Sequence, residues 1–209
     1  MGAKTALIFG AMDAGEWGFL APLKGEAPAV FCADGGLACA IRAGFSPQYY
    51  IGDGDSGGAP MAGIPATVLP TRKDLTDLQA AWEWAYAMGY RRLYLTGCTG
   101  GRQDHHIAAL QLLEAMANRG CEGRILDAQN EIAFLQPGEY RIQREAYPYF
   151  SLLPVDALLT VSISGASYDL ARQTVRRGDS LCVSNEFQGR PVTLTVYDGC
   201  CYLILSERK

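Results

Sequence analysis

The chain has 209 residues, of which 49% are hydrophobic and 19% charged, so it can form one large domain or two small ones and should not be disordered. Its formal net charge is −4 and no long run of lysine or arginine stands out, which argues against a nucleic-acid partner. No stretch approaches the roughly 20 apolar residues of a membrane-spanning helix, and the first residues do not resemble a signal peptide. The seven cysteines are scattered without a C-x-x-C pair, as is typical of buried thiols in a reducing compartment. We therefore expect a cytoplasmic protein with no membrane partner.

Strand-like apolar runs alternate with helical patterns through the first 130 or so residues. The predicted strands are 5–10, 29–33, 48–51, 66–70, 91–97 and 123–128. A helix begins after Thr76, which forms a T-x-x-Q capping box with Gln79, and a second helix begins near Asp104. The apolar stripes expected to be buried are Leu78, Ala81, Trp82 and Ala85 in the first helix and Ala109, Leu112, Leu113 and Met116 in the second. Glycines 89 and 120 should end these helices. The alternation predicts a parallel, Rossmann-like α/β sheet domain over residues 1–129.

The pattern changes near Asn130 to short runs rich in valine, leucine, threonine and tyrosine. Residues 131–135 and 139–143 flank Pro137 and Gly138 and predict a hairpin. Further strands are predicted at 149–155, 157–164, 179–185, 192–199 and 202–207, whereas residues 169–177 are ambiguous between strand and helix. We expect residues 130–209 to form a small all-β domain, either a sandwich or an open barrel, with the sandwich preferred.

Four loops that follow predicted strands of the first domain carry aspartates. They contain, in order, Asp34 with Gly35; Asp53, Asp55 and Ser56; Lys73, Asp74 and Asp77; and Arg102, Asp104 and His105. Because ligands of open parallel sheets bind beyond the carboxyl ends of the strands, these loops should converge. Crowded carboxylates repel one another, and Mg²⁺ relieves that repulsion while it bridges carboxylates to phosphates. Glycines and helix N-termini supply amide donors to phosphate oxygens. The loops therefore predict a Mg²⁺–polyphosphate site.

Other interpretations of these loops are weaker. Glycines 52, 54 and 57 spell G-x-G-x-x-G, but the two intervening acids would face a pyrophosphate. A calcium loop that begins at Asp53 would need a glutamate at its twelfth position, where Ile64 stands. Ordinary turn chemistry is enough to explain any one loop. Four acidic loops at one edge of a sheet favour a binding site.

Six motifs in this order resemble the thiamine pyrophosphokinase family. They are D-G-G at 34–36, G-D-x-D-S at 52–56, K-D-x-T-D at 73–77, G-x-x-G-G-R-x-D-H at 97–105, F-S-L-x-P at 150–154, and Y-x-L with S-N-E at 168–170 and 184–186. The resemblance implies an α/β nucleotide-binding domain followed by a β-sandwich that helps to bind thiamine, in a homodimer with shared active sites. It also implies transfer of the pyrophosphoryl group of ATP to the hydroxyl of thiamine, with Mg²⁺, to give thiamine diphosphate and AMP.

The resemblance also implies roles for individual residues. The implied metal ligands are Asp53, Asp55, Asp74 and Asp77, and the implied catalytic set adds Arg102 and Asp104. The chemistry of the transfer also asks for a group that accepts the proton of the thiamine hydroxyl, and Asp74 or Asp104 is the candidate. The implied ATP-site residues are Asp34, Gly35, Ser56, Lys73, Arg102, Asp104 and His105. The implied thiamine-side residues are Ser184 and Asn185. All three tryptophans lie in the first domain, so Tyr168 is the candidate for stacking on thiamine.

The chain departs from the family pattern at Gly54, Gln79 and Gln103, and none of these departures removes a carboxylate. Two other functions stay open at this stage. Another Mg²⁺-dependent phosphate or nucleotidyl transferase on the same scaffold would share the acidic loops and ignore thiamine. A non-catalytic nucleotide sensor would bind ATP and release no AMP.

Overall fold

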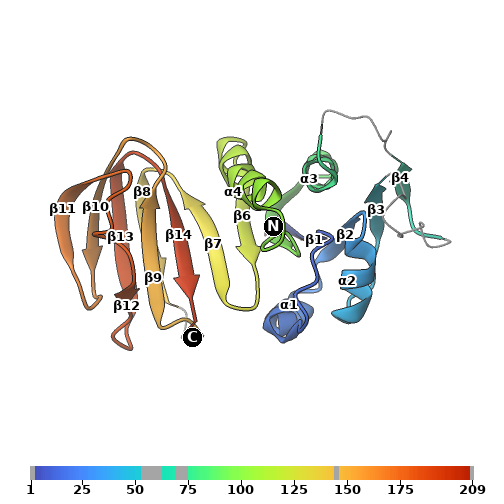
Figure 1. Cartoon of the computed structure of the whole chain (residues 1–209), viewed down its shortest axis with the longest axis horizontal. Coiled ribbons are helices and arrows are strands. Elements are labelled where there is room, and N and C mark those ends of the chain that lie inside the picture. Colours follow the sequence, from blue (N-terminus) through green and yellow to red (C-terminus); the bar gives the residue numbers. More distant parts are fainter. Residues whose placement is uncertain (1–2, 53–62, 69–74, 144–145, 208–209) are drawn as a thin grey trace. The chain divides into compact units, whose positions relative to one another are not determined.

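The computed structural model describes residues 3–52, 63–68, 75–143 and 146–207, and the chain divides into two compact units, Met1–Ala128 and Gln129–Lys209 (Figure 1). Within the described residues, no helix combines the length and the apolar character needed to cross a membrane.

The first unit contains a parallel sheet with the strand order β6-β5-β1-β2-β3-β4. The strands are β1 (Lys4–Phe9), β2 (Ala29–Ala33), β3 (Tyr49–Gly52), β4 (Ala66–Val68), β5 (Tyr90–Thr96) and β6 (Glu122–Leu126). The central strand β1 is buried from Ala6 to Phe9. A parallel strand with helices on both faces is buried on both sides, which explains this continuous apolar run.

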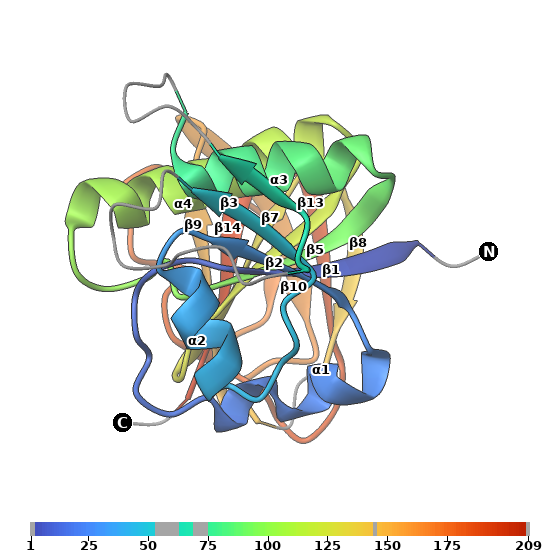
Figure 2. The ribbon, with the colours of Figure 1, turned by 90° about the vertical axis from the view of Figure 1, so that its right-hand side faces the viewer.

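Helices cover both faces of this sheet. They are a 3₁₀ turn η1 (Gly18–Leu20), α1 (Ala21–Glu26), α2 (Gly36–Arg42), α3 (Asp77–Ala87) and α4 (Gln103–Asn118). Figure 2 shows α3 and α4 on one face and α1 and α2 on the other. The sequence interpretation did not include α1. A parallel α/β sheet was expected here, and it is confirmed.

The sequence signals for α3 and α4 are confirmed. The hydroxyl of Thr76 accepts a hydrogen bond of 3.2 Å from the amide of Gln79, as a capping residue does. The predicted stripes are buried at Ala81, Trp82 and Ala85 in α3 and at Ala109, Leu112, Leu113 and Met116 in α4. Leu78, which was also expected to be buried, is only half-buried, because it lies in the first turn of α3. Gly89 and Gly120 follow the helix ends with positive φ angles of 86° and 72°, a conformation in which glycine costs least.

The second unit contains two antiparallel sheets, with the orders β12-β9-β14-β7 and β11-β10-β13-β8. The strands are β7 (Asn130–Leu135), β8 (Gly138–Ile142), β9 (Tyr149–Pro154), β10 (Leu158–Ser164), β11 (Leu170–Arg176), β12 (Asn185–Glu186), β13 (Val192–Asp198) and β14 (Cys201–Ser206). The core of this unit draws residues from both sheets, for example Phe150 and Leu203 from one and Val161 and Leu194 from the other. The all-β character expected for this half is confirmed.

Two expectations for the second unit were wrong. Residues 131–135 and 139–143 do not form a hairpin, because β7 pairs with β14 whereas β8 pairs with β13 in the other sheet. Pro137 lies where the chain passes between sheets, and proline has no amide to donate to a ladder. Residues 179–185 form turns rather than a strand, and only Asn185 and Glu186 pair, with β9. The Asp179 carboxylate accepts the amide of Arg176 there, which is typical of a turn. The ambiguous segment 169–177 contains strand β11.

Candidate functional site

A pocket of about 890 Å³ opens at the carboxyl edge of the parallel sheet. It is built from the loops after β1, β2 and β5, from the start of α3 and from one side of α4. The lining residues are Gly10, Ala11, Met12, Ala33, Asp34, Thr76, Asp77, Leu78, Gln79, Gly97, Cys98, Gly100, Arg102, His105, Ala108, Ala109, Gln111, Leu112 and Ala115. This is the edge at which open α/β sheets bind ligands.

Two glycines allow the loops after β1 and β5 to meet at this pocket. A Cβ atom on Gly97 would lie 2.6 Å from the carbonyl oxygen of Gly10, and one on Gly10 would lie 2.5 Å from the carbonyl oxygen of Gly97. Gly97 also has a φ of 64°, which L side chains rarely adopt. The amides of Gly10 and Met12 donate to Thr96 and Gly97 at 2.7 and 2.9 Å and hold the loop there. The close approach leaves backbone atoms at the pocket wall.

Asp34 is the most constrained acid of the pocket. It follows β2, is only 9% exposed, and has a φ of 49°, which is uncommon for any residue except glycine. Its amide donates to the carbonyl of Ile51 at 2.7 Å, and its carboxylate accepts the hydroxyl of Tyr50 at 3.5 Å. Backbone strain of this kind concentrates at functional sites, where the surrounding structure holds it in place.

The start of α3 contributes Thr76 and Asp77 to the pocket. A helix begins with amides that have no carbonyl partner within the helix, and its dipole favours negative charge at this end. Asp77 lies in the first turn, where a carboxylate is stabilised. The same amides suit the oxygens of a bound phosphate.

Arg102 and Asp104 form an exposed ion pair at the start of α4. The guanidinium donates to the two carboxylate oxygens at 2.6 and 3.1 Å, a bidentate arrangement. These hydrogen bonds from Arg102 lower the pKa of Asp104 to about 2. The Asp104 carboxylate also accepts the amide of His105 at 2.9 Å. Arg102 therefore carries a fixed positive charge at the pocket, held by a neighbouring carboxylate.

The remaining pocket wall is largely apolar. It comes from Leu78 on α3 and from Ala108, Leu112 and Ala115 on α4, with the carboxamides of Gln79 and Gln111 beside them. A flat aromatic ring fits a wall of this composition, while phosphates fit the glycine-rich and charged wall. Cys98 lines the pocket but is no nucleophile, because burial raises the pKa of its thiol to about 12.

The structure brings together four predicted site residues, namely Asp34, Asp77, Arg102 and His105. The Asp104 carboxylate accepts hydrogen bonds from two of them, Arg102 and His105. Gly35 directly follows Asp34 and is not part of the wall itself. The predicted residues Asp53, Asp55, Ser56, Lys73 and Asp74 lie outside the described residues. Within the described parts of the chain, no three His, Cys, Asp or Glu residues converge as a metal site.

Sequence reasoning missed the loop after β1. Gly10, Ala11 and Met12 line the pocket although they were not among the candidates. The signal was present, because the first predicted strand also ends in a glycine and is followed by an aspartate, Asp13. This loop lies at the same pocket as Asp34 and Arg102.

The predicted thiamine-side residues lie in the second unit. Tyr168 is 66% exposed, whereas Asn185 is 4% exposed and hydrogen-bonds to the backbone of Tyr168. Ser184 has a φ of 58°, and its amide donates to the hydroxyl of Ser151 at 2.9 Å.

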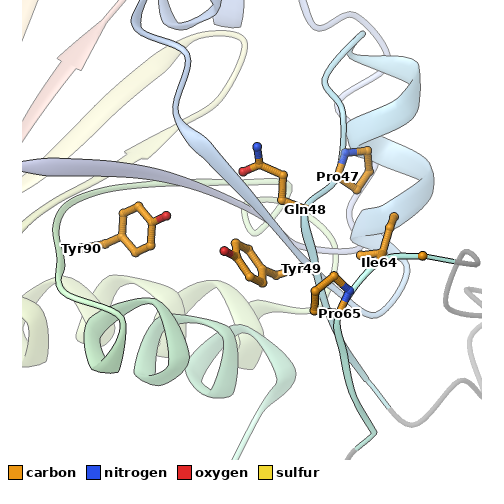
Figure 3. A pocket seen from close by; sticks show the side chains of 7 residues that line it. Pro47, Gln48, Tyr49, Ile64, Pro65 and Tyr90 are labelled. Carbon is orange, nitrogen blue, oxygen red and sulfur yellow. The ribbon is translucent and has the colours of Figure 1, made fainter.

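A second, shallower pocket of about 480 Å³ lies at the amino edge of the same parallel sheet (Figure 3). Its wall consists of Pro47, Gln48, Tyr49, Gly63, Ile64, Pro65 and Tyr90 and includes no charged side chain. In Figure 3 the hydroxyls of Tyr49 and Tyr90 point toward each other. Burial raises the pKa of Tyr90, and the neighbouring Tyr49 raises it further through its charge and a hydrogen bond.

The fold and the larger pocket together define a two-unit protein of mixed class, in which a parallel α/β unit carries a strand-end pocket with the make-up of a phosphate-binding site and an antiparallel β unit follows. The family model for "Thiamin pyrophosphokinase, catalytic domain" matches residues 20–124, and that for "Thiamin pyrophosphokinase, vitamin B1 binding domain" matches residues 139–201. The chain belongs to the thiamine pyrophosphokinase family, as its motifs predicted.

Individual relatives agree with this assignment. Thiamine pyrophosphokinase from Bacillus subtilis (strain 168) is 31% identical over 181 residues, which cover 83% of this chain and 85% of the relative. The crystal structure of thiamin pyrophosphokinase from Geobacillus thermodenitrificans is similar with a TM-score of 0.87 and 30% identity, over 98% of both chains. The enzyme from Candida albicans has the same fold, with a TM-score of 0.82 over 99% of this chain and 90% of that one, at 15% identity.

Proposed function

We propose that this protein transfers the pyrophosphoryl group of ATP to the hydroxyl of thiamine, giving thiamine diphosphate and AMP. One observation carries the proposal. The segment matched by the catalytic-domain model, residues 20–124, contains the pocket residues Asp34, Asp77, Arg102 and His105. The charged and glycine-rich wall suits the phosphates of ATP, and the apolar wall along α4 suits its base.

The chemistry asks mainly for positioning and for charge neutralisation, because phosphoryl transfer needs little covalent help from a protein. Arg102 is placed to stabilise negative charge on the phosphates once it exchanges Asp104 for a phosphate partner. The first amides of α3 add donors that need no reorganisation. Asp104, which the exchange would release, is a candidate to accept the proton of the thiamine hydroxyl, and Asp74 is the other candidate.

Mg²⁺ is part of the proposal, and the described donors fit it. Mg²⁺ binds proteins through one or two carboxylates and completes its shell with water and substrate phosphates. Asp34 and Asp77 supply carboxylates at the pocket, and Asp53, Asp55 and Asp74 remain predicted ligands outside the described residues. Bound Mg²⁺ would offset the charge of the reacting phosphates.

The second unit is the proposed thiamine-binding unit, since the vitamin B1 binding model matches residues 139–201. Tyr168 offers an exposed ring for stacking on thiamine, which carries a cationic thiazolium. A sandwich architecture, a homodimer with shared active sites and a cytoplasmic location complete the proposal.

The direct test mixes the purified protein with thiamine, ATP and Mg²⁺ and quantifies AMP and thiamine diphosphate by chromatography, beside a reaction without metal. Equal amounts of both products are expected, and only with Mg²⁺. Asp77→Asn should reduce the rate at least about tenfold, whereas Asp198→Asn, an exposed aspartate of β13, should leave it unchanged. Formation of ADP and thiamine monophosphate would contradict the proposal that a pyrophosphoryl group is transferred. ATP binding without turnover would favour another acceptor or a nucleotide sensor.

A further inference from the structure

The carboxamide of Asn185 is committed to the protein's own backbone. Its Oδ1 accepts the amides of Tyr168 and Glu186 at 3.1 and 2.8 Å, and its Nδ2 donates to the carbonyl of Tyr168 at 2.8 Å. A carboxamide oxygen has two lone pairs, and both are occupied here. The second N–H of Nδ2 lies outside these bonds. Since only 4% of the residue's surface is exposed, Asn185 has little surface with which to contact a ligand.

Unlike Asn185, Tyr168 has an exposed side chain. Tyr168 is 66% exposed, yet the side chain of Asn185 holds both the backbone amide and the backbone carbonyl of Tyr168. The surrounding loop is held at further points, because the amide of Ser167 donates to the carbonyl of Glu186 at 3.0 Å and the amide of Ala166 donates to the Asp169 carboxylate at 2.9 Å. An exposed aromatic ring on a fixed backbone is preorganised for binding, since less entropy is lost when a ligand contacts it.

We propose that Asn185 is a positioning residue, which acts on thiamine through Tyr168 and does not itself touch the substrate. This inference rests on the proposed function. It corrects the role that the family resemblance implies for Asn185 as a direct thiamine-side contact. The Y-x-L and S-N-E segments, which are separated by 13 residues in the sequence, then act as one hydrogen-bonded unit whose exposed part is the ring of Tyr168.

A double-mutant cycle on the full-length protein tests the proposal. The variants are Tyr168→Ala, Asn185→Asp and the double variant, with the Kd for thiamine measured by calorimetry and the KM values for thiamine and ATP measured by the product assay. Asn185→Asp keeps the shape and the acceptor oxygen but places a carboxylate oxygen against the carbonyl of Tyr168 in place of the donor. If it does not fold, Asn185→Ser replaces it in the cycle.

Tyr168→Ala should raise the Kd for thiamine about tenfold, since aromatic stacking and cation–π contact are lost. Asn185→Asp should raise it by about threefold to tenfold with the KM for ATP unchanged, because the backbone that carries the ring is no longer held. The double variant should bind thiamine no more weakly than Tyr168→Ala alone. The matched control is Tyr197→Ala, at another exposed tyrosine of this unit, and it should stay within about twofold of the parent protein.

Two results would overturn the inference. Additive effects in the double variant would mean that Asn185 contacts thiamine on its own account. An unchanged Kd in Tyr168→Ala would mean that the ring carries no binding. Hydrogen exchange gives a readout independent of thiamine, because the amide of Tyr168 should exchange faster in Asn185→Ser than in the parent. A parent protein that binds no thiamine would instead contradict the proposed function itself.

Discussion

The two edges of the parallel sheet differ in chemistry although the same strands build both. At the carboxyl edge, β2 and β5 run into Asp34 and Gly97, and the pocket there has backbone atoms, carboxylates and a guanidinium in its wall. At the amino edge, β3 and β5 begin with Tyr49 and Tyr90, and the pocket there is aromatic and proline-rich. The rings of Phe31 and Tyr49 stack there with centroids 4.4 Å apart.

The difference indicates that the amino edge of the sheet serves stability and that the carboxyl edge serves ligand binding. Aromatic contacts at the amino edge stabilise the fold without needing any ligand. At the carboxyl edge, the close glycine approach and the left-handed Asp34 cost stability, and this cost is expected where function requires the geometry. Substitutions at the two edges should therefore separate activity from stability.

The largest expected effect is on activity, at Asp34. Asp34→Asn and Asp34→Gly should each lower kcat/KM for ATP about 100-fold or more, since both remove a pocket carboxylate. Asp34→Gly should nevertheless keep or raise the free energy of unfolding by up to about 1 kcal/mol, because glycine adopts a φ of 49° without strain. The measurements are product formation and urea denaturation of each variant. An active Asp34→Gly variant would show that turnover does not need the carboxylate, and a destabilised variant would show that the carboxylate stabilises the fold.

Gly97→Ala should have the next largest effect, and it should affect stability as well as activity. The new Cβ would lie 2.6 and 2.9 Å from the carbonyl oxygens of Gly10 and Met12, both of which are backbone atoms. We expect the free energy of unfolding to fall by about 2–4 kcal/mol. Gly120→Ala is the matched control, since it has a similar φ of 72° but no atom within 4 Å of the new Cβ. It should cost only about 1 kcal/mol, and equal losses in both variants would contradict the close-approach argument.

Tyr49→Ala should lower stability and leave catalysis unchanged. Its ring stacks on Phe31 and meets Trp84 edge-on with centroids 5.2 Å apart. We expect a loss of about 2–3 kcal/mol in the free energy of unfolding, with kcat/KM within about twofold of the parent at a temperature where both are folded. Tyr49→Phe keeps the rings together and should cost about 1 kcal/mol or less. A Tyr49→Ala variant that folds well but has lost activity would show that the amino edge takes part in function.

Much of the first unit could be predicted from the sequence because its signals are local. The capping residue Thr76 and the stripe through Ala81 and Trp82 specify α3 without any knowledge of the rest of the chain. A parallel sheet then places the loops after its strands at one edge, so the convergence of Asp34, Asp77 and Arg102 followed from topology.

In the second unit, local sequence signals do not predict which strands pair. The segments on either side of Pro137 look like a hairpin, yet they belong to different sheets, and strand partners are chosen by packing across the whole core. Likewise, the sequence marks Asn185 as a polar residue in a motif but does not reveal that its side chain is buried against the backbone of Tyr168. Hydrogen bonds between residues distant in sequence become visible only once the fold is known.

The smallest expected effect on stability comes from the Arg102–Asp104 pair. This pair also allows the two edges to be compared by the pKa values of their side chains. Asp104 has a pKa of about 2, below its ordinary value, because Arg102 hydrogen-bonds to its charged form. Any stability from the pair is therefore present above the ordinary pKa of an aspartate and is lost as the pH falls toward 2. Both groups are exposed to solvent, which screens the attraction, so the unfolding midpoint should hardly change.

The pKa itself should change clearly. Carbon-detected NMR of the Asp104 carboxyl in Arg102→Gln should give a pKa that has risen toward the ordinary value, whereas Lys4→Gln, a distant cation of the same unit, should leave it near 2. An unchanged pKa in Arg102→Gln would show that the ion pair does not form in solution. At the amino edge the shift has the opposite sense and another cause, because burial raises the pKa of Tyr90. The shift at the carboxyl edge thus favours the charged form of Asp104, while the shift at the amino edge favours the neutral hydroxyl of Tyr90.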